Sequence, residues 1–424
     1  MEKIDISKLT DQQEDAFSQF QKLRVGALFM KMGTGKTRVA LELVNNSNCD
    51  FLLYLTPVST KENIKQEIEK WGINCDYNIV GYESIAASDE IYFNVLNELD
   101  NYENKFIIAD ESIFIKNKRT KRFTRSVELR KKCQFALILN GTPIVKNEFD
   151  LINQMNFLSE KIIPFRGYDI VQNFFEEHHI RKYGREMTYY KFYEPNRPIL
   201  VKLIKPYCFY ADLKFDKNEN IENIWVDVDD TSYEEMFEKI YEESLWNMEV
   251  FIKMFNILNK ESSICPEKNK EVSDYIRDKK VICFCNYIEE IKQIEENLGG
   301  QCYKIDGSTS LNKRNEIIKE FEDGDNKPLI LSLGVGSYSL NLQFCNEIVY
   351  SSLSFNFAKM EQSKYRIKRT GQVNDIKYTY ILSNLKINQL IYKNLDEKQT
   401  LKELIETILE DEDINKFIET NLKG

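Results

Sequence analysis

The sequence predicts an α/β fold with two parallel sheets, because short apolar runs alternate with longer amphipathic segments in two separate stretches of the chain. The runs of the first stretch are VGALFM (25–30), FLLYLT (51–56), YNIVGY (77–82), KFIIAD (105–110) and FALILN (135–140). Those of the second stretch are KVICFC (280–285), CYKID (302–306), PLILSL (328–333), EIVYSS (347–352) and KYTYIL (377–382). Apolar runs of this length indicate buried strands, and the helical segments between them indicate parallel pairing.

Breaks in this alternation predict the domain boundaries. We expect a first lobe over residues 1–215, with a core of about 1–160 and an extension over 161–215 in which aromatic and basic residues dominate. Residues 216–275 are predicted to be a linker, with a polar loop at DKNENIEN (216–223), followed by a helical segment. The second lobe is expected over residues 276–424, where the amphipathic residues 386–409 predict a C-terminal helix. A chain of 424 residues is long enough for two such cores.

The composition is typical of a water-soluble globular protein, with 42% hydrophobic and 30% charged residues. The longest apolar run, residues 51–55, is too short to span a bilayer, and the start MEKIDISKLT lacks the apolar core of a signal peptide. We therefore expect a cytoplasmic protein without a membrane partner. The nine cysteines follow no metal or disulfide spacing, and His178 and His179 have no further ligands nearby, so we expect no metal site there.

Residues 30–37, MKMGTGKT, follow an apolar run and precede the helical pattern TRVALELVNN. A strand, a glycine-rich turn and a helix together form a phosphate-binding loop, in which backbone N–H groups point at the ligand. Lys36 is predicted to reach the β- and γ-phosphates of ATP, and the Thr37 hydroxyl to bind Mg²⁺. Met30 stands where the general pattern has glycine, and the alternative is a GKT that occurs by chance in a surface loop.

Two further groups are predicted to complete this site. Asp110 ends an apolar strand and would hold Mg²⁺, and Glu111 would polarise the attacking water as general base. Arg366 and Arg369 are predicted to lie one helical turn apart on the same face of a helix. If the second lobe closes on the first, their guanidinium groups would meet the charge that develops on the γ-phosphate. The alternative for the arginines is a surface salt-bridge pair.

The net charge of −10 argues weakly against a nucleic-acid partner. Residues 116–132, KNKRTKRFTRSVELRKK, nevertheless carry nine Lys or Arg against the single acid Glu128. A looser basic stretch with interleaved tyrosines follows at residues 181–205. Residues 116–132 are either a surface for phosphates or a solvated helix face.

Taken in order, many strings resemble the motifs of the Swi/Snf-type ATPases of the second helicase superfamily. In the first lobe these strings are LTDQQEDA (9–16), MGTGKT (32–37), TPVSTKENIKQEIEKW (56–71), GYESI (81–85), DESIFIKN (110–117) and NGTPIVKN (140–147). In the second lobe they are VICFCNY (281–287), DGSTSLNKR (306–314), LSLGVGSYSLNL (331–342) and QSKYRIKRTGQ (362–372). The chain resembles a minimal form of the family, of the kind that phages and bacteria encode, which would place it in the bacterial host cytoplasm.

Four residues depart from the family's pattern. Ile113 stands where DEAHxIKN has histidine, Asn140 replaces a threonine, and Ser337 and Ser339 replace glycines. At Ile113, Ser337 and Ser339 we expect the coupling between the ATP site and the neighbouring loops to differ from the family.

The resemblance implies two RecA-like lobes that bind ATP and Mg²⁺ between them, duplex DNA along both lobes, and a C-terminal helix that braces the lobes. It adds these residues to the nucleotide site: Gln13, Met32, Gly33, Thr34, Gly35, Gly336 and Gln362. It implies contacts to backbone phosphates from Thr56, Lys61, Lys116, Asn117, Arg119, Gly307, Ser308, Ser332 and Asn341. We expect a monomer, with replication or recombination proteins as further partners.

The leading hypothesis is a DNA-dependent ATPase that translocates on double-stranded DNA and remodels protein–DNA or branched DNA structures. One alternative is a strand-separating helicase in replication or repair, although the sequence shows no obvious strand-separating pin. The other is an ATP-gated DNA clamp or loader that hydrolyses ATP only for release. An intact set of Lys36, Glu111, Arg366 and Arg369 favours a full hydrolysis cycle without excluding the clamp. Resemblance alone disfavours RNA.

Overall fold

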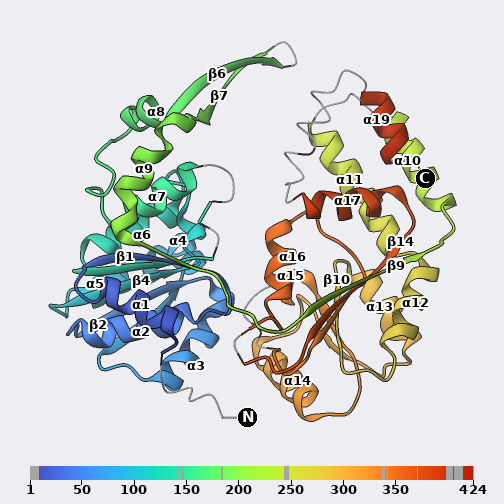
Figure 1. The fold of residues 1–424 in the computed structure, drawn as a ribbon, viewed down its shortest axis with the longest axis horizontal. Coiled ribbons are helices and arrows are strands. Elements are labelled where there is room, and N and C mark those ends of the chain that lie inside the picture. Colours follow the sequence, from blue (N-terminus) through green and yellow to red (C-terminus); the bar gives the residue numbers. More distant parts are fainter. Residues whose placement is uncertain are drawn as a thin grey trace. The chain divides into compact units, whose positions relative to one another are not determined.

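The computed structural model describes residues 9–141, 143–144, 148–182, 185–242, 248–336, 340, 342–369, 371–397, 404 and 414–423. The chain divides into two compact units, unit 1 (Met1–Lys214) and unit 2 (Phe215–Gly424), coloured blue to green and green to red in Figure 1. Each unit contains its own parallel sheet, so the predicted α/β class with two sheets is confirmed.

The sheet of unit 1 has six parallel strands in the order β3-β2-β4-β5-β1-β8. Their bounds are β1 (Val25–Met30), β2 (Phe51–Thr56), β3 (Asp76–Gly81), β4 (Lys105–Asp110), β5 (Phe135–Leu139) and β8 (Cys208–Ala211). The five apolar runs predicted for this lobe all form strands, whereas β8 was not predicted. Because the strands are parallel, their carboxyl ends lie at one edge of the sheet, which is where ligands bind in open α/β folds.

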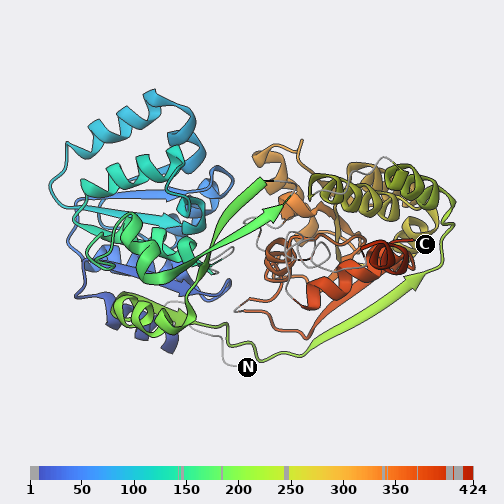
Figure 2. The same cartoon turned by 90° about the horizontal axis from the view of Figure 1, so that it is seen from above.

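Helices cover both faces of this sheet, as the view from above shows (Figure 2). They are α1 (Asp11–Phe20), α2 (Lys36–Asn46), α3 (Lys61–Trp71), α4 (Tyr82–Ala87), α5 (Asp89–Leu99), α6 (Lys121–Lys131), α7 (Glu148–Leu158), α8 (Tyr168–Phe174) and α9 (Arg197–Ile204), with the short 3-10 turns η1 (Val58–Thr60), η2 (Ser112–Ile115), η3 (Glu194–Asn196) and η4 (Lys205–Tyr207). Alternate residues of each strand face opposite cores: Leu52 and Tyr54 pack with α1 to α3, whereas Leu53 and Leu55 pack with α4 to α7. Burial on both faces explains why these strands are continuous apolar runs.

An antiparallel hairpin extends from unit 1, formed by β6 (Phe175–Lys182) and β7 (Arg185–Phe192) (Figure 1). Aromatic rings fix its base: Phe175 stacks on Phe149 with ring centroids 3.7 Å apart, and meets Phe192 edge to face at 5.6 Å. The hairpin falls within the predicted aromatic and basic extension, where the sequence predicted no strands.

The sheet of unit 2 also has six parallel strands, in the order β11-β12-β10-β13-β14-β9. Their bounds are β9 (Glu219–Val226), β10 (Ile282–Cys285), β11 (Tyr303–Ile305), β12 (Leu329–Ser332), β13 (Glu347–Tyr350) and β14 (Ile376–Ser383). The five predicted strands are confirmed. The predicted loop over residues 216–223 is wrong for its second half, because Glu219 to Asn223 pair with β14 at the edge of the sheet.

The helices of unit 2 also pack on both faces of its sheet. They are α10 (Thr231–Glu242), α11 (Met248–Ser263), α12 (Pro266–Ile276), α13 (Ile288–Asn297), α14 (Leu311–Asp323), α15 (Leu333–Gly336), α16 (Phe357–Lys364), α17 (Lys386–Asp396) and α19 (Ile414–Asn421). The predicted C-terminal helix is present as α17, which buries Ile387, Leu390 and Ile391 in the core of unit 2. Residues 398–403 and 405–409 of that prediction lie outside the described residues, and bracing of both lobes stays a prediction.

None of the helices that the structure describes combines the length and the apolar character that a bilayer crossing requires.

Candidate nucleotide site and nucleic-acid interface

The predicted phosphate loop connects the carboxyl end of β1 to the first turn of α2. Met30 is fully buried at the end of the strand, and the helix begins at Lys36. Gly33 and Gly35 have φ angles of 80° and 81°, in the left-handed region that favours glycine. A Cβ atom on Gly35 would also collide with the side-chain amide of Gln13. The two left-handed glycines therefore turn the chain from β1 directly into the amino end of α2, the arrangement that phosphate-binding loops use.

Gln13, predicted on the nucleotide side, contacts the phosphate loop directly. Its Nε2 donates to the carbonyl of Thr34 at 2.9 Å, and its Oε1 accepts from the backbone N–H of Thr10 at 3.0 Å. The Thr34 hydroxyl in turn donates to the carbonyl of Lys31 at 2.7 Å. Gln13, Thr34 and Gly35 are thus brought together, with the half-buried Met32 and Gly33 in the same turn.

Asp110 lies at the carboxyl end of β4 and is only 9% exposed. Its Oδ2 accepts from the Tyr54 hydroxyl at 3.2 Å, and its Oδ1 accepts from the backbone N–H of Glu111 at 2.9 Å. Burial raises the pKa of Asp110 to about 7, and the Glu111 carboxylate adds to this rise, while the Lys36 ammonium opposes it. Lys36 and Asp110 therefore act on each other electrostatically within unit 1.

Tyr54 connects Asp110 to the phosphate loop. Its phenol donates to Asp110. Burial is the main reason why the pKa of Tyr54 is raised well above its usual value, and the neighbouring Thr37 side chain acts on the phenol by lowering that pKa, so the phenol stays protonated and remains a donor. The two predicted Mg²⁺ ligands, Thr37 and Asp110, thus both act on one buried hydroxyl. A carboxylate and a threonine hydroxyl are oxygen donors of the kind that this hard cation prefers.

Glu111 marks the sharp end of β4. It has φ 47° and ψ 52°, a left-handed conformation that costs a residue with a side chain roughly 1–2 kcal/mol. The hydrogen bond from its N–H to Asp110 Oδ1 and the bond from the Tyr82 hydroxyl to the Asp110 carbonyl, 2.8 Å long, stabilise this turn. Strain at a position predicted to be the general base is consistent with a functional constraint on its placement.

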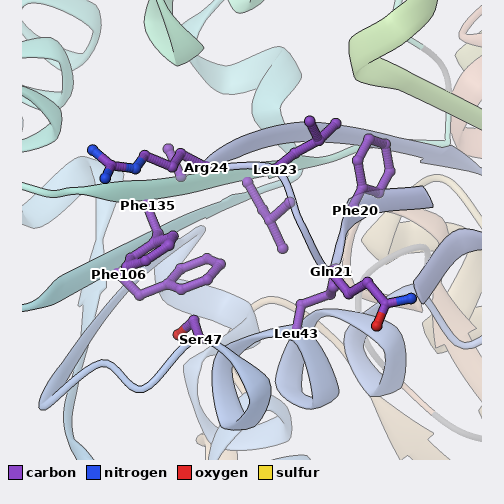
Figure 3. A pocket seen from close by; sticks show the side chains of 10 residues that line it. Phe20, Gln21, Leu23, Arg24, Leu43, Ser47, Phe106 and Phe135 are labelled. Carbon is purple, nitrogen blue, oxygen red and sulfur yellow. The ribbon is translucent and has the colours of Figure 1, made fainter. Parts of the chain in front are cut away.

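A separate small cavity lies at the opposite, amino ends of the same strands (Figure 3). Its lining includes Phe20, Leu23, Leu43, Phe106, Phe135 and Leu137. No predicted nucleotide residue contributes to this lining, so the cavity is not part of the nucleotide site.

The predicted arginines belong to unit 2, and the structure gives them different environments. Arg366 is 1% exposed, and its Nε and Nη1 donate to the carbonyls of Gln362 and Leu340, both at 3.1 Å. Arg369 is half-buried, and its Nε donates to the Tyr365 carbonyl at 2.7 Å. The prediction that they share one helix face is wrong, because α16 ends at Lys364 and both follow it in turns.

The other predicted nucleotide residues of unit 2 lie in two different helices. Gln362 is half-buried within α16, and Gly336 ends the short α15. Ser337, Ser339 and Asn341 lie outside the described residues. A meeting of Arg366 and Arg369 with Lys36 and Asp110 stays a prediction.

The predicted phosphate contacts of unit 1 fall into two groups. Thr56 is fully buried, and its hydroxyl is hydrogen-bonded to that of Thr60, so in this conformation it shapes the loop and does not face a phosphate. Lys61 is half-buried at the start of α3. Asn117 and Arg119 are exposed, and the Asn117 Oδ1 accepts from the Arg119 backbone N–H at 3.0 Å.

Several cations of the basic segment 116–132 have structural partners. Lys116 Nζ lies 3.5 Å from an Asp150 carboxylate oxygen, and Arg125 pairs with Asp89. Three more cations of the segment are also engaged: Lys131 with Glu128, Lys132 with Asp100, and Arg130 with the Leu158 carbonyl. These five cations therefore already have partners within unit 1.

The remaining four cations are consecutive or nearly so: Lys118, Arg119, Lys121 and Arg122. Lys118, Arg119 and Lys121 are exposed, and among the residues that the structure describes none of the four has a carboxylate at ion-pair distance. Arg122 instead lies over the Phe114 ring, 5.6 Å from its centroid. We call these four residues the 118–122 cluster. It concentrates positive charge that is available to an anionic partner.

The predicted phosphate contacts of unit 2 follow neighbouring strands. Gly307 and Ser308 are exposed directly after β11, and Ser332 ends the adjacent β12. Ser308 is already engaged, because its hydroxyl donates to Asp306 at 2.6 Å, a bond that lowers the pKa of that carboxyl. The three residues therefore lie at one edge of the second sheet.

Sequence reasoning missed Tyr54, Tyr82 and Gln154, whose side chains contact the segments of the nucleotide site. The sequence carried a signal for Tyr54, which is the one side-chain hydroxyl inside the apolar run FLLYL. Gln154 is one of three buried polar residues of α7, with Asp150 and Asn153, so the sequence did not single it out.

A parallel sheet, a glycine-rich turn into a helix and a buried aspartate on a neighbouring strand define a nucleotide-binding protein of the P-loop class. Comparison with known families is more specific. The family model described as "SNF2-related domain" matches residues 51–287, and the one described as "Helicase conserved C-terminal domain" matches residues 267–371. The first match covers more than half of the chain, which therefore belongs to the SNF2-related family.

Individual relatives are distant. The chain is 22% identical to "DNA annealing helicase and endonuclease ZRANB3" of Homo sapiens, over 87% of this chain and 37% of that protein. It is 23% identical to an "Uncharacterized ATP-dependent helicase" of Mycoplasma pneumoniae, over 91% of this chain and 40% of that protein. The chain thus spans about two fifths of the length of these curated relatives. A solved structure, "Sulfolobus solfataricus SWI2/SNF2 ATPase core in complex with dsDNA", is 19% identical with a TM-score of 0.41, and the match covers 98% of this chain and 97% of that one.

Proposed function

We propose that this protein is a DNA-dependent ATPase that translocates on double-stranded DNA and remodels protein–DNA or branched DNA structures. The observation that carries the proposal is the phosphate loop of unit 1, with Lys36 acting electrostatically on the buried Asp110. The SNF2-related family match supports ATP as the nucleotide.

In this proposal the residues of unit 1 bind and orient ATP. Lys36 and the N–H groups at the start of α2 neutralise the phosphate charge. Thr37 and Asp110 would hold Mg²⁺, which when bound offsets charge on the phosphate oxygens. Glu111 would accept the proton of the attacking water, and its left-handed backbone ends the strand so that the two neighbouring carboxylates take different roles.

Arg369 would supply positive charge from unit 2. Its half-buried side chain is the more accessible of the two arginines, whereas Arg366 is committed to backbone carbonyls within unit 2. A guanidinium that reaches the γ-phosphate only when ATP is bound would couple nucleotide state to the approach of the units.

Double-stranded DNA is the proposed polymer, and the exposed positive charge of the 118–122 cluster supports binding to its backbone phosphates. Backbone phosphates position a protein on nucleic acid and carry no sequence information directly. The human relative is described as a DNA annealing helicase, which supports DNA over RNA.

The test is the steady-state ATPase rate without nucleic acid and with single-stranded DNA, duplex DNA, forked DNA or RNA, together with triplex displacement and fork unwinding. We expect strong stimulation by duplex DNA and displacement of the third strand. The same rate with and without every nucleic acid would exclude a motor. Stimulation by duplex DNA without triplex displacement would favour the clamp or loader.

The β6–β7 hairpin favours strand separation as a second candidate function. It extends from unit 1, and the Tyr189 ring, 45% exposed, stacks on His178 with centroids 5.2 Å apart. Exposed aromatic rings stack on unpaired bases. If the hairpin separates strands, Tyr189→Ala should abolish fork unwinding while duplex-stimulated ATPase remains. A wild-type protein that unwinds no fork would remove this candidate.

A further inference from the structure

Gln154 in α7 is a fully buried polar side chain with four hydrogen bonds. Its Oε1 accepts from the Ser112 hydroxyl at 2.6 Å and from Asn140 Nδ2 at 3.1 Å. Its Nε2 donates to the carbonyls of Pro143 at 2.6 Å and Asp150 at 2.8 Å. A glutamine amide has two donor hydrogens and one oxygen with two lone pairs, so Gln154 uses its full hydrogen-bonding capacity.

These bonds join two segments of the nucleotide site. Ser112 is fully buried in the turn that directly follows Asp110 and Glu111. Asn140 directly follows β5, and its backbone N–H donates to the Leu28 carbonyl of β1 at 3.1 Å. We call Asp110, Glu111 and the turn that follows them the acidic turn. Gln154 therefore connects the acidic turn with the segment after β5.

The segment after β5 is also bonded, through the Asn140 N–H, to β1, the strand that leads into the phosphate loop. Gly141 faces the start of the loop, where even a Cβ would find ordinary contact distances of 3.7 Å to the Met30 carbonyl oxygen and the Met32 nitrogen. A movement of the phosphate loop that displaces β1 would therefore reach Gln154 through Asn140. Close-packed interiors transmit displacements of this kind because they leave no free space to absorb them.

The polar contacts make this connection specific. A hydrogen bond in a dry interior is stronger than one in water, and a buried polar group that loses its partner has no solvent to replace it. The acidic turn and the segment after β5 must therefore move together or break bonds to Gln154. Ile113 stands where the motif DEAHxIKN has a histidine, and its side chain has no polar atom. The hydrogen-bonded connection between the acidic turn and Gln154 therefore passes through Ser112.

We propose that Gln154 is a positioning residue that couples the acidic turn of Asp110 and Glu111 to the phosphate loop, through Ser112 on one side and Asn140 on the other. The proposal rests on the ATPase function proposed above. Gln154 does not touch the nucleotide, and it acts by holding Glu111 in register with the phosphates. Its loss should therefore slow the chemical step and leave nucleotide binding nearly intact.

Ser112→Ala tests the proposal with the smallest change, because it removes one hydroxyl and leaves the rest of the network in place. We expect kcat to fall about tenfold while KM for ATP stays within about twofold, the pattern of an interaction that acts on the transition state. Ser126→Ala is the matched control, because Ser126 is equally buried and its hydroxyl has no hydrogen-bond partner among the described residues. It should change neither constant, and Ser112→Thr, which restores a hydroxyl, should recover part of kcat.

Hydrogen exchange gives a second test that does not need turnover. In the wild type, a non-hydrolysable ATP analogue should slow amide exchange in the peptide that begins at Asn140, and in Ser112→Ala this protection should be lost although the analogue still protects the start of α2. A wild-type protein without such protection, or a Ser112→Ala variant with unchanged kcat, would overturn the proposal. ATP turnover that is not stimulated by any DNA would instead contradict the proposed motor function. The kcat of Ser112→Ala and the exchange protection would still test the role of Gln154 in that case.

Discussion

At the scale of single residues, the environments of Arg366 and Arg369 predict different consequences of losing them. Arg366→Ala removes a buried guanidinium that donates to the carbonyls of Gln362 and Leu340, and it leaves those acceptors and a cavity behind. We expect a lower unfolding temperature together with lower turnover. Arg369→Ala removes a half-buried group and should cut turnover by about 10³-fold or more at an unchanged unfolding temperature and nucleotide affinity.

Differential scanning fluorimetry and ATPase assays on both variants check this contrast. Equal loss of stability in the two variants would contradict it, and full turnover in Arg369→Ala would refute the role of that residue as an arginine finger.

Lys36 and Glu111 should separate binding from hydrolysis. Lys36→Ala removes the ammonium that we propose to contact the phosphates, so we expect both ATP binding and hydrolysis to be lost. Glu111→Gln preserves the shape of the turn but removes the proton acceptor, so binding should persist while kcat falls by about 10²–10⁴-fold. Calorimetric titration with ATP and a steady-state assay measure the two effects, with Lys31→Ala in the same loop as the matched control. Hydrolysis by Glu111→Gln at the wild-type rate would exclude Glu111 as the base.

At the scale of elements, the 118–122 cluster and the last turn of α6 offer a matched comparison. Changing Lys118, Arg119, Lys121 and Arg122 to Gln should flatten the salt dependence of DNA binding, with the logarithmic slope reduced by about 0.9 for each phosphate that the variant no longer neutralises. Changing Lys131 and Lys132 should alter the slope little, because they pair with Glu128 and Asp100. Fluorescence anisotropy with duplex DNA at several salt concentrations measures the slopes. Equal slopes in the two variants would mean that the cluster is merely solvated.

A buried ion pair joins α12, α13 and the segment after β13 in unit 2. Lys268 and Glu290 are both fully buried, with Nζ 3.2 Å from Oε1. Lys268 also donates to the carbonyls of Ser263 and Ser351, both at 2.7 Å, and the Ser352 hydroxyl donates to Glu290 at 2.9 Å. Lys268→Met leaves the Glu290 charge buried without its counter-charge, which should cost about 3–5 kcal/mol of unfolding free energy.

The exposed pair of Lys260 and Glu289, 2.8 Å apart, provides the control for that substitution. Lys260→Met should cost no more than about 1 kcal/mol, because solvent screens the pair. Urea unfolding followed by fluorescence compares the two variants. A small effect of Lys268→Met would mean that water reaches Glu290 once the lysine is gone.

The sequence predicted the eight interior strands of the two described sheets because they are largely buried on both faces and therefore apolar. It also predicted the edge strands β3 and β11, but it missed the other edge strand of each sheet. Among the described strands β9 pairs with β14 alone, and Glu219, Asn220 and Glu222 are exposed, so the polar run ENIENIWV gives the pattern of a loop. The edge strand β8 has only four residues, and β6 and β7 pair mainly with each other, so neither shows a long apolar run.

The candidate site likewise contains groups that the sequence predicted and groups that it missed. Glycines and charged groups at fixed spacing identified the phosphate loop and the acid pair, because their chemistry demands those residue types. The contacts of Tyr54 and Gln154 depend on which strands and helices become neighbours. The lone hydroxyl in FLLYL marks Tyr54 as unusual, but it does not identify the partner of that hydroxyl. The role of the two arginines stays a prediction, and their separate environments follow from the end of α16 at Lys364.

At the scale of the whole molecule, the proposed cycle requires the units to approach when ATP binds, because Lys36 and Asp110 belong to unit 1 and Arg369 to unit 2. Glu111→Gln should trap the ATP-bound state, so adding ATP and Mg²⁺ to this variant should lower its radius of gyration in small-angle X-ray scattering. ADP should have little effect, because it lacks the γ-phosphate that the arginine would contact. The double variant with Arg369→Ala should bind ATP equally well but fail to contract, since a ligand shifts an equilibrium only by its differential affinity for the two states. Contraction of the double variant to the same extent would show that the units approach without this arginine, and the coupling would then have to be assigned to other groups of unit 2.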